Sequence, residues 1–362
     1  MEVQVFSIEM LPSAHGDGLL IEYGDAASPA RVLIDGGTEA AYRTLMARIE
    51  RLDSTDRHFE LLVITHIDAD HVGGIVKMLE KNELGAQFDE VWFNGFPHLE
   101  AAEVPLTSDV EYFGALQGER LSTCLLAQNI PWNARFGCGA VRVRDDGTLP
   151  SVMLGGGLKL TVLGPTRDKL LKLKPVWEKE CAKAGLDPLN QLRPVVEEPG
   201  VEPMGIPNVD ALAATPFKED NAPANGSSIS LLAEFDGKRI LLGADAHPTT
   251  LESAIDRLIG KGQRLPLTAF KLPHHASKHN VSVDLLQRVQ CKKYLVSTNG
   301  AQFKHPDREA VARVIKHGGA SPMLYFNYET TLNAVWATPT LKENFDYEAV
   351  YADEEGGLTV AL

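Results

Sequence analysis

The sequence has only four cysteines and no long apolar run. These two features argue against a disulfide-bonded protein and against a membrane-spanning one. Its four cysteines, Cys124, Cys138, Cys181 and Cys291, show no CxxC spacing, which predicts neither a disulfide framework nor a thiolate zinc site. No apolar stretch is long enough to span a bilayer. The first ten residues, MEVQVFSIEM, lack a basic region before an apolar stretch and do not read as a signal peptide. We therefore expect a cytoplasmic protein that does not contact membranes.

Basic residues are also scarce. The chain has 35 Lys and Arg against 49 Asp and Glu, and the net charge of −14 opposes nonspecific binding to phosphates. Residues 257–293 reverse this balance, because only Asp284 opposes eight basic residues there: Arg257, Lys261, Arg264, Lys271, Lys278, Arg288, Lys292 and Lys293. The stretch is either a solvated helix face with its loop or a surface that attracts an anionic substrate.

Strand and helix patterns alternate along both halves of the chain, without a linker that separates two domains. The apolar run 61–65 predicts a strand buried on both faces, and residues 74–82 predict a helix entered through Gly73 and Gly74. Residues 227–245 predict a hairpin that turns at Asp236-Gly237. This pattern is typical of a layered α/β fold, and we expect one domain over residues 1–362.

Residues 187–224 depart from the pattern, because they contain seven of the 21 prolines. Proline interrupts hydrogen-bond ladders, so this segment predicts neither a regular helix nor a central strand. It is either a tolerated surface insertion or a lid across a cleft.

The stretch VITHIDADHVGG, residues 63–74, places His66, Asp68, Asp70 and His71 directly after a predicted buried strand. Imidazoles and carboxylates are the ligands of catalytic zinc and manganese. Gathering them in a water-excluded site without a cation would be electrostatically costly. The spacing therefore predicts a metal site at the strand end.

The same stretch resembles the signature of the metallo-β-lactamase fold, and most closely the branch that includes the hydrolase domain of the DNA-uptake protein ComEC. Further similar segments follow in order: AHGDGLLIEYG (14–24), LIDGG (33–37), NGSSISLLAEF (225–235), LLGAD (241–245), KLPHHASKHN (271–280) and HPD (305–307). His15 and Ala276 depart from the usual glutamine and glycine, and the membrane channel of the DNA-uptake protein is absent. The resemblance implies an αββα sandwich. The pattern of LYFNY and the tail that follows it predicts an extra C-terminal strand region at about 322–362.

The resemblance also implies a pair of divalent metal ions, Zn²⁺ or Mn²⁺. One metal would take His66 and Asp68, the other Asp70, His71 and one histidine of the pair His274 and His275, with Asp245 bridging them. Adjacent residues in an extended segment point oppositely, so only one of the pair should bind. We favour His275, with His274 hydrogen-bonding behind it as the alternative ligand.

The first metal site is one imidazole short of better-known zinc enzymes with this fold. Only His98 lies in the interval where a further histidine would be expected, and it is either that ligand or an ordinary loop histidine. Asp68 supplies a hard oxygen ligand. Manganese and magnesium are therefore plausible metals for this site, in addition to zinc. Asp17 and Asp35, at strand ends, either brace the site through hydrogen bonds or form turns.

These features predict a hydrolase that acts through a metal-bound hydroxide, with Asp70 orienting it as a general base. The basic stretch favours a phosphodiesterase or nuclease acting on a nucleic acid or nucleotide. The candidate substrate-binding residues are Lys278, Asn225, Ser227 and His305. The alternatives are a small-molecule esterase or phosphocholine-type hydrolase, and a non-catalytic sensor or scaffold that keeps the metals for stability.

Overall fold

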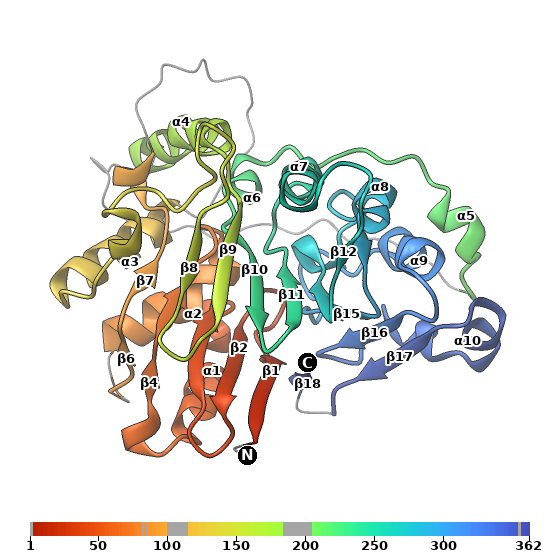
Figure 1. Ribbon diagram of the computed structural model, residues 1–362, viewed down its shortest axis with the longest axis horizontal. Coiled ribbons are helices and arrows are strands. Elements are labelled where there is room, and N and C mark those ends of the chain that lie inside the picture. Colours follow the sequence, from red (N-terminus) through yellow and green to blue (C-terminus); the bar gives the residue numbers. More distant parts are fainter. Residues whose placement is uncertain (1–2, 82, 84, 100–114, 184–204, 354–355) are drawn as a thin grey trace.

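The computed structural model describes residues 3–81, 83, 85–99, 115–183, 205–353 and 356–362, and these form a four-layered αββα sandwich (Figure 1). Two sheets pack face to face, and helices cover the outer face of each. The sandwich predicted from the resemblance is therefore confirmed.

The first sheet has the strand order β18-β1-β2-β3-β5-β7. Strands β1 to β3 are antiparallel, whereas β3, β5 and β7 run parallel. The strands are β1 (Gln4–Met10), β2 (Leu19–Asp25), β3 (Ala30–Ile34), β5 (Leu61–Val63), β7 (Val91–Trp92) and β18 (Leu358–Ala361).

The second sheet has the order β17-β16-β15-β13-β11-β10-β9-β8, and its strands from β11 to β17 are parallel. The hairpin predicted at Asp236-Gly237 joins β10 to β11, with both turn residues at positive φ. The strands are β8 (Ser151–Met153), β9 (Lys159–Gly164), β10 (Ser230–Phe235), β11 (Lys238–Leu242), β13 (Ala269–Lys271), β15 (Lys293–Val296), β16 (Met323–Phe326) and β17 (Glu348–Tyr351). Two further strand pairs, β4 (His58–Phe59) with β6 (Gln87–Phe88) and β12 (Leu265–Pro266) with β14 (Val289–Gln290), are short.

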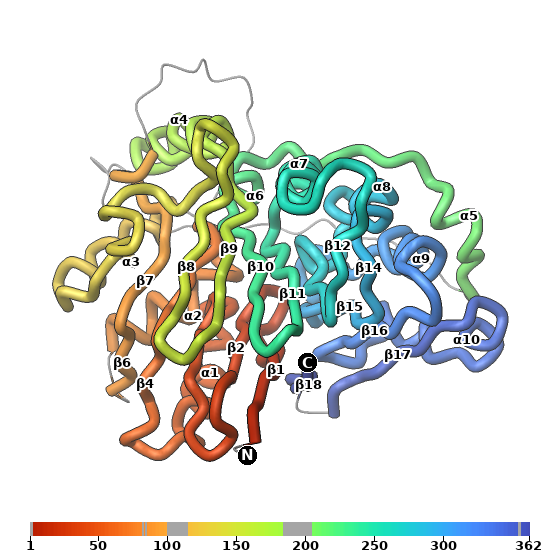
Figure 2. The backbone as a smooth tube through the Cα atoms, viewed as in Figure 1, coloured from red at the N-terminus to blue at the C-terminus, as the bar shows by residue number. Residues whose placement is uncertain are grey.

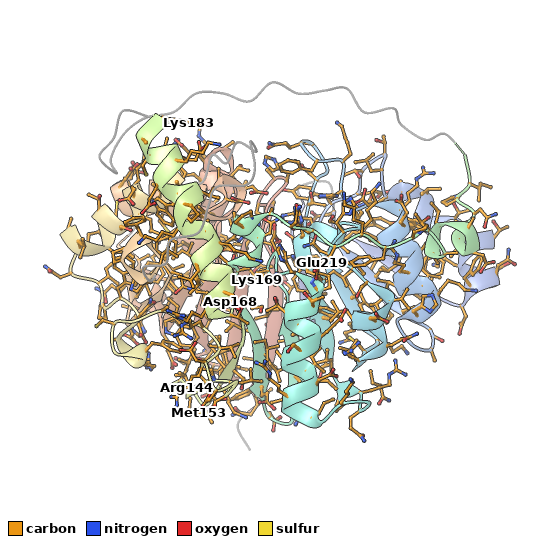
Figure 3. All side chains as sticks on the ribbon, turned by 90° about the horizontal axis from the view of Figure 1, so that it is seen from above. Arg144, Met153, Asp168, Lys169, Lys183 and Glu219 are labelled. Carbon is orange, nitrogen blue, oxygen red and sulfur yellow. The ribbon has the colours of Figure 1, made fainter. Side chains whose placement is uncertain are left out.

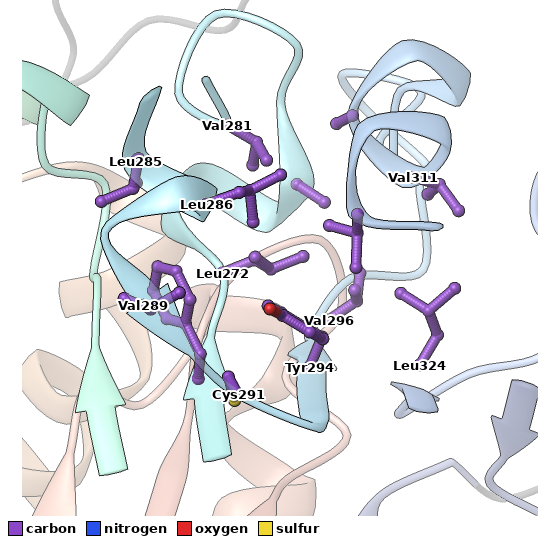
Figure 4. Packing of buried hydrophobic residues seen from close by; sticks show 14 of the residues in the cluster. Leu272, Val281, Leu285, Leu286, Val289, Cys291, Tyr294, Val296, Val311 and Leu324 are labelled. Carbon is purple, nitrogen blue, oxygen red and sulfur yellow. The ribbon is translucent and has the colours of Figure 1, made fainter. Parts of the chain in front are cut away.

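Three apolar clusters hold the layers together. The inner faces of both sheets share one cluster, as the alternation of apolar residues along the strands requires. A second cluster joins the first sheet to α1 (Tyr42–Glu50), α2 (Ala69–Lys81), α3 (Ala115–Ala127) and α4 (Arg167–Lys183). The third, part of which is drawn in Figure 4, joins the second sheet to α5 (Val209–Ala213), α7 (Pro248–Ile259), α8 (Val283–Gln287), α9 (Arg308–His317) and α10 (Pro339–Phe345).

Helix α2 begins at Ala69, so the prediction that its chain enters through Gly73 and Gly74 is wrong. Both glycines lie inside the helix, at a close contact with the loop after β3. A Cβ on Gly74 would lie 2.0 Å from the carbonyl oxygen of Gly36, and one on Gly73 would lie 2.6 Å from the nitrogen of Glu39. The glycines therefore allow the helix to pack against that loop, and the early start places Asp70 and His71 in its first turn.

The proline-rich segment 187–224 is described only from residue 205. Its residues 187–204 lie outside the described part of the chain, so the choice between insertion and lid is not tested there. The remainder contains two short helices, α5 and α6 (Pro223–Gly226), although the prolines had predicted none. Pro207 and Pro216 leave room between them for the five residues of α5, and Pro223 occupies a first helical position, which proline tolerates.

The C-terminal region extends the second sheet and ends in a strand that pairs with β1. Strands β16 and β17 extend the second sheet, and β18 then pairs antiparallel with β1 of the first sheet. Figure 2 shows β18 beside β1. The predicted extra strands are present, but α10 and a 3₁₀ helix at Ala334–Ala337 interrupt them. Among the described residues, no helix has the length and apolar character needed to cross a bilayer.

Candidate metal centre

The parallel strands of both sheets end at a common edge, and the predicted ligands lie in the loops that follow them. His66 comes after β5, Asp245 after β11, and His274 and His275 after β13. Loops at the carboxyl ends of parallel strands are the usual position of a site in α/β proteins. The fold therefore gathers residues that are up to 209 positions apart in the sequence.

Asp245 stands at the centre of this group, with only 2% of its surface exposed. Its Oδ2 atom lies 3.4 Å from Nε2 of His71 and 3.8 Å from Nε2 of His66. The Nε2 atoms of His274 and His275 both lie 3.7 Å from the same oxygen. Asp245 thus has the central position that a bridging carboxylate requires.

Both histidines of the pair face Asp245, so the expectation that adjacent residues point oppositely is wrong. That expectation assumed an extended segment, whereas Pro273–Ala276 forms a tight 3₁₀ turn. His274 and His275 have φ angles of 47° and 52°, which is the left-handed region. This conformation turns both rings to the same side.

Asp70 and Asp68 lie at the edge of the group. Oδ2 of Asp70 is 3.6 Å from Nε2 of His275, and Oδ2 of Asp68 is 3.5 Å from Nε2 of His66. Asp68 is the more exposed of the two carboxylates. All seven predicted side chains, His274 included, therefore converge on one region.

The donor atoms fit divalent metal ions. Four buried atoms have no hydrogen-bond partner: Nε2 of His66, His71 and His275, and Oδ1 of Asp245. The separations of 3.4–3.8 Å are long for hydrogen bonds. They are close to the spacing of about 3.4 Å between two tetrahedral ligands that each lie about 2.0–2.1 Å from one zinc ion. Unpartnered buried polar atoms are rare, and bound cations would account for these four.

The other ring nitrogen of each of these histidines is engaged. Nδ1 of His71 donates to Oδ2 of Asp35 over 2.8 Å, and Nδ1 of His275 donates to the carbonyl oxygen of Ser297 over 2.8 Å. Nδ1 of His66 lies 3.0 Å from Oγ1 of Thr65. These contacts fix the tautomers in which Nε2 carries the free lone pair, as metal ligation requires.

In the metal-free cluster, burial and the neighbouring charges shift the pKa values of the carboxylates and imidazoles. Burial raises the pKa of the Asp245 carboxyl, but His71, His274 and His275 outweigh it and hold that pKa well below its usual value. For His275, burial lowers the pKa while Asp245, Asp17 and Asp70 raise it, with a net result of about 9. Without metal, the ionised Asp245 carboxylate therefore lies beside His71 and His275, whose pKa values are both raised above the ordinary value.

Asp17 and Asp35 brace the site, as one of the two sequence interpretations proposed. Asp35 accepts hydrogen bonds from Thr65 as well as His71. Oδ1 of Asp17 lies 3.4 Å from Nδ1 of His275, and its Oδ2 accepts a 2.6 Å hydrogen bond from Nζ of Lys271. Lys271 is fully buried. A lysine within the apolar stretch TAFKLP was the sequence signal for this buried ion pair.

A polar network that the sequence reasoning missed surrounds His274. Its Nδ1 donates to Oδ1 of Asn280 over 2.9 Å, and Asp220 accepts hydrogen bonds from Asn280 and Asn225. Asn225, predicted to bind substrate, therefore points at Asp220 and supports the histidine. Ser227 uses its hydroxyl to donate to the carbonyl oxygen of Ala224, and is 2% exposed.

The network continues beyond the metal centre. His247 lies 3.8 Å from Asp220, and its Nδ1 is 2.5 Å from Nζ of Lys169 on α4. Burial lowers the pKa of this lysine. Lys169 and Glu219 are labelled in Figure 3, and Glu219 accepts the backbone N–H of Thr249 at the start of α7. No sequence pattern singled out Asp220 or Lys169.

His98 lies apart from the cluster. Its ring packs 4.7 Å from that of Trp132, measured between centroids, and burial lowers its pKa. None of the metal-competent donor groups among the described residues includes it. The position favours the loop interpretation over the ligand interpretation.

His305 does approach the centre. Its ring centroid lies 5.2 Å from that of His274, and burial lowers its pKa. The Nδ1 atom has no hydrogen-bond partner and lies 3.4 Å from Oδ2 of Asp307. A neutral imidazole therefore stands beside the cluster.

Three of the eight basic residues in the stretch 257–293 have carboxylate partners, which weakens the argument for an anionic substrate from that stretch. Lys271 is buried against Asp17, Lys278 pairs with Glu309 at 3.4 Å, and Arg288 pairs with Asp256 at 3.1 Å. Counting charges along the sequence did not reveal that carboxylates from other segments pair with them.

Comparison with known proteins agrees with this architecture. A family model described as the metallo-beta-lactamase superfamily matches residues 29–84, which include His66, Asp68, Asp70 and His71. None of the curated proteins matches the sequence.

Solved structures similar to the chain include the following two. One is CmlA from Streptomyces venezuelae, described as a diiron beta-hydroxylase, with 12% identity and a TM-score of 0.40 over 99% of this chain and 55% of that one. The other is the metallo-beta-lactamase MIM-1 from Novosphingobium pentaromativorans, with 16% identity and a TM-score of 0.32 over 86% and 89%. This chain thus spans about half the length of CmlA, and similarities this weak carry no conclusion about activity. The sandwich and the match over residues 29–84 together identify a metallo-β-lactamase fold.

Proposed function

We propose that the protein is a metal-dependent hydrolase whose substrate is a phosphodiester of a nucleotide or nucleic acid. One observation carries the metal-dependent part: the Nε2 atoms of His66, His71 and His275 are buried, lack hydrogen-bond partners and lie within 3.8 Å of the Asp245 carboxylate. Such an arrangement is costly without a cation, because it desolvates polar atoms and returns no hydrogen bonds.

The position of each residue in the cluster assigns it a role in binding metal or in orienting water. His66, His71, His275 and Asp245 would hold the metals, with Asp68, Asp70 and His274 completing the set. Bound divalent ions supply Lewis-acid stabilisation of the attacked group and acidify a bound water. His71 and His275 keep the pKa of Asp70 below its usual value despite burial. Asp70 therefore stays ionised, accepts a hydrogen bond from the attacking water and orients it.

The substrate class rests on the surroundings of the centre. His305 presents a neutral imidazole beside His274, where it would contact the leaving group of a bound ester. Lys304, which precedes His305, and Arg308, the first residue of α9, line an adjoining groove. These two cations, and not the stretch 257–293, support an anionic substrate.

The test compares two chromogenic substrates, bis(4-nitrophenyl) phosphate and 4-nitrophenyl acetate, with the protein loaded with Mn²⁺ or Zn²⁺. We expect phosphodiester hydrolysis that EDTA abolishes and that His275→Ala removes. His58→Ala serves as the matched control, because His58 is exposed on β4 and lies outside the cluster.

Each of the other possible results would contradict the proposal or favour a different function. Hydrolysis of the acetate alone would contradict the phosphodiester proposal and favour the esterase. Metal binding without hydrolysis of either compound would favour a sensor or scaffold. A protein that binds no metal would contradict the hydrolase proposal altogether.

A further inference from the structure

A groove of about 1110 Å³ lies beside the metal centre, in the C-terminal half of the molecule. It is bounded by residues 205–215, by the loop that leads into α9, and by residues 331–335. Ile206, Leu212, Leu332 and Val335 give it an apolar wall, and Lys304 and Arg308 give it charge. Pockets for small ligands typically measure about 300–1,000 Å³, so this one can accept a group of nucleotide size.

The loop that carries His305 links the groove to the metal centre. Lys278 and Pro306 belong to its lining, and the residue between Pro306 and the centre is His305, whose ring contacts that of His274. His274 in turn faces Asp245. A substrate whose reacting group lies at Asp245 can therefore extend past His305 into the groove.

Some charged side chains of the groove have ion-pair partners, and others do not. Glu309 pairs with Lys278, and Asp307 accepts the backbone N–H of Lys278 and faces His305. Lys304 instead donates to the carbonyl oxygen of Ala301, and Arg308 to that of Gly205. No carboxylate in the described part of the chain lies within ion-pair distance of either cation. Within the described residues, these two positive charges therefore lack a carboxylate partner and can bind an anionic ligand.

We infer that this groove is a subsite for a second anionic group of the substrate, a phosphate that is bound but not hydrolysed. Lys304 and Arg308 hold this phosphate, and the apolar wall contacts the part of the substrate between it and the reacting ester. The inference rests on the proposed function, because it takes the reacting group to be a phosphodiester at the metal centre. It adds that a terminally phosphorylated nucleotide substrate is preferred over an unphosphorylated one.

The experiment uses a matched pair of ligands, the dinucleotides TpT and pTpT, which differ only in a terminal phosphate. Binding is measured by calorimetry on the full chain in EDTA, where no hydrolysis interferes, and steady-state kinetics follow with Mn²⁺. We expect pTpT to bind about tenfold more tightly than TpT, since charge-assisted hydrogen bonds to one phosphate supply a gain of that order.

Variants then test which side chains cause the preference for pTpT over TpT. The double variant Lys304→Ala/Arg308→Ala should remove the preference, so that it binds pTpT and TpT with equal affinity. Ile206→Glu, at a side chain that is 70% exposed, should weaken pTpT through repulsion while leaving the fold intact. Lys261→Ala, which removes an exposed charge outside the groove, is the control and should preserve the ratio.

Equal affinities of the wild type for the two dinucleotides, or a preference that survives the double variant, would overturn the subsite. The proposed function fails separately, if the Mn²⁺-loaded protein hydrolyses no phosphodiester. In that case a retained preference for pTpT in EDTA would still establish the phosphate subsite of the groove.

Discussion

Asp35 orients His71 directly, through a 2.8 Å hydrogen bond from Nδ1 of the imidazole to Oδ2 of the carboxylate. The same oxygen accepts the hydroxyl of Thr65, whose Oγ1 lies 3.0 Å from Nδ1 of His66. One buried carboxylate thereby fixes the tautomers of two histidines on the β5–α2 turn. Their Nε2 atoms are left free to face Asp245.

This arrangement predicts that Asp35→Ala lowers the affinity for Mn²⁺ by about 10–100-fold, the usual effect of removing a partner behind a metal ligand. Asp35→Asn should lose less, because its amide oxygen still accepts from His71. Calorimetric titration of the EDTA-treated protein measures both values. Asp25→Ala is the control, since Asp25 only caps its own exposed turn. An unchanged affinity in Asp35→Ala would refute the orienting role.

The first turn of α2 provides a direct test of the predicted ligands. Asp70→Ala and His71→Ala should each abolish hydrolysis and reduce the bound metal, while the circular dichroism spectrum keeps its helical signal. The helix persists because alanine favours helices and α2 is anchored by its buried apolar face. If Asp70→Ala retained both metals and full activity, the assignment of the site would be wrong.

The protonation of His275 predicts opposite pH dependences with and without metal. Its pKa in the metal-free fold is about 9, above the ordinary 6.5. Its contribution to the stability of the metal-free protein is therefore full below about pH 6.5 and is lost as the pH rises through about 9. Metal binding requires the deprotonated ring, so the affinity for Mn²⁺ should rise over the same interval.

Thermal unfolding in EDTA, repeated with Mn²⁺ at each pH, measures both trends. Metal-free stability that stays level across this interval, together with a constant metal affinity, would contradict this account of the cluster.

The buried pair of Lys271 and Asp17 predicts a large effect on stability. Lys271→Met leaves the Asp17 carboxylate buried without its cation, and breaking such a pair costs about 3–5 kcal/mol of unfolding free energy. Adding Asp17→Asn removes the stranded charge and should recover part of that loss. Urea unfolding of the two variants measures the difference. A single variant as stable as the wild type would show that the pair contributes little.

Local patterns predicted a layered α/β fold and a metal site at His66–His71, whereas the αββα arrangement and the distant ligands were predicted from the family resemblance. The hairpin at Asp236-Gly237 follows from turn chemistry, and the HxDxDH spacing places its side chains on one turn whatever the rest of the chain does. The left-handed turn at His274 and His275 was not predicted, because no glycine or asparagine marks it. Tertiary contacts around Ala244 and Ser297 hold it in place.

Charges were the least predictable feature. Lys271, Lys278 and Arg288 read as a basic stretch, yet their partners Asp17, Glu309 and Asp256 come from other segments. The pairing depends on how the sheets and helices pack, which the one-dimensional pattern does not contain. Asp220 was missed for the same reason, since its partners Asn225, Asn280 and His274 meet it only in the folded chain.

The metal content of the purified protein tests the central claim most directly. Mass spectrometric metal analysis of the wild type, after dialysis against Mn²⁺ or Zn²⁺, should give two ions per chain. Asp245→Ala should lose most of this metal, because Asp245 lies within 3.8 Å of four imidazole nitrogens. A wild type that retains no divalent metal, or an Asp245→Ala variant that retains two ions per chain, would contradict the account.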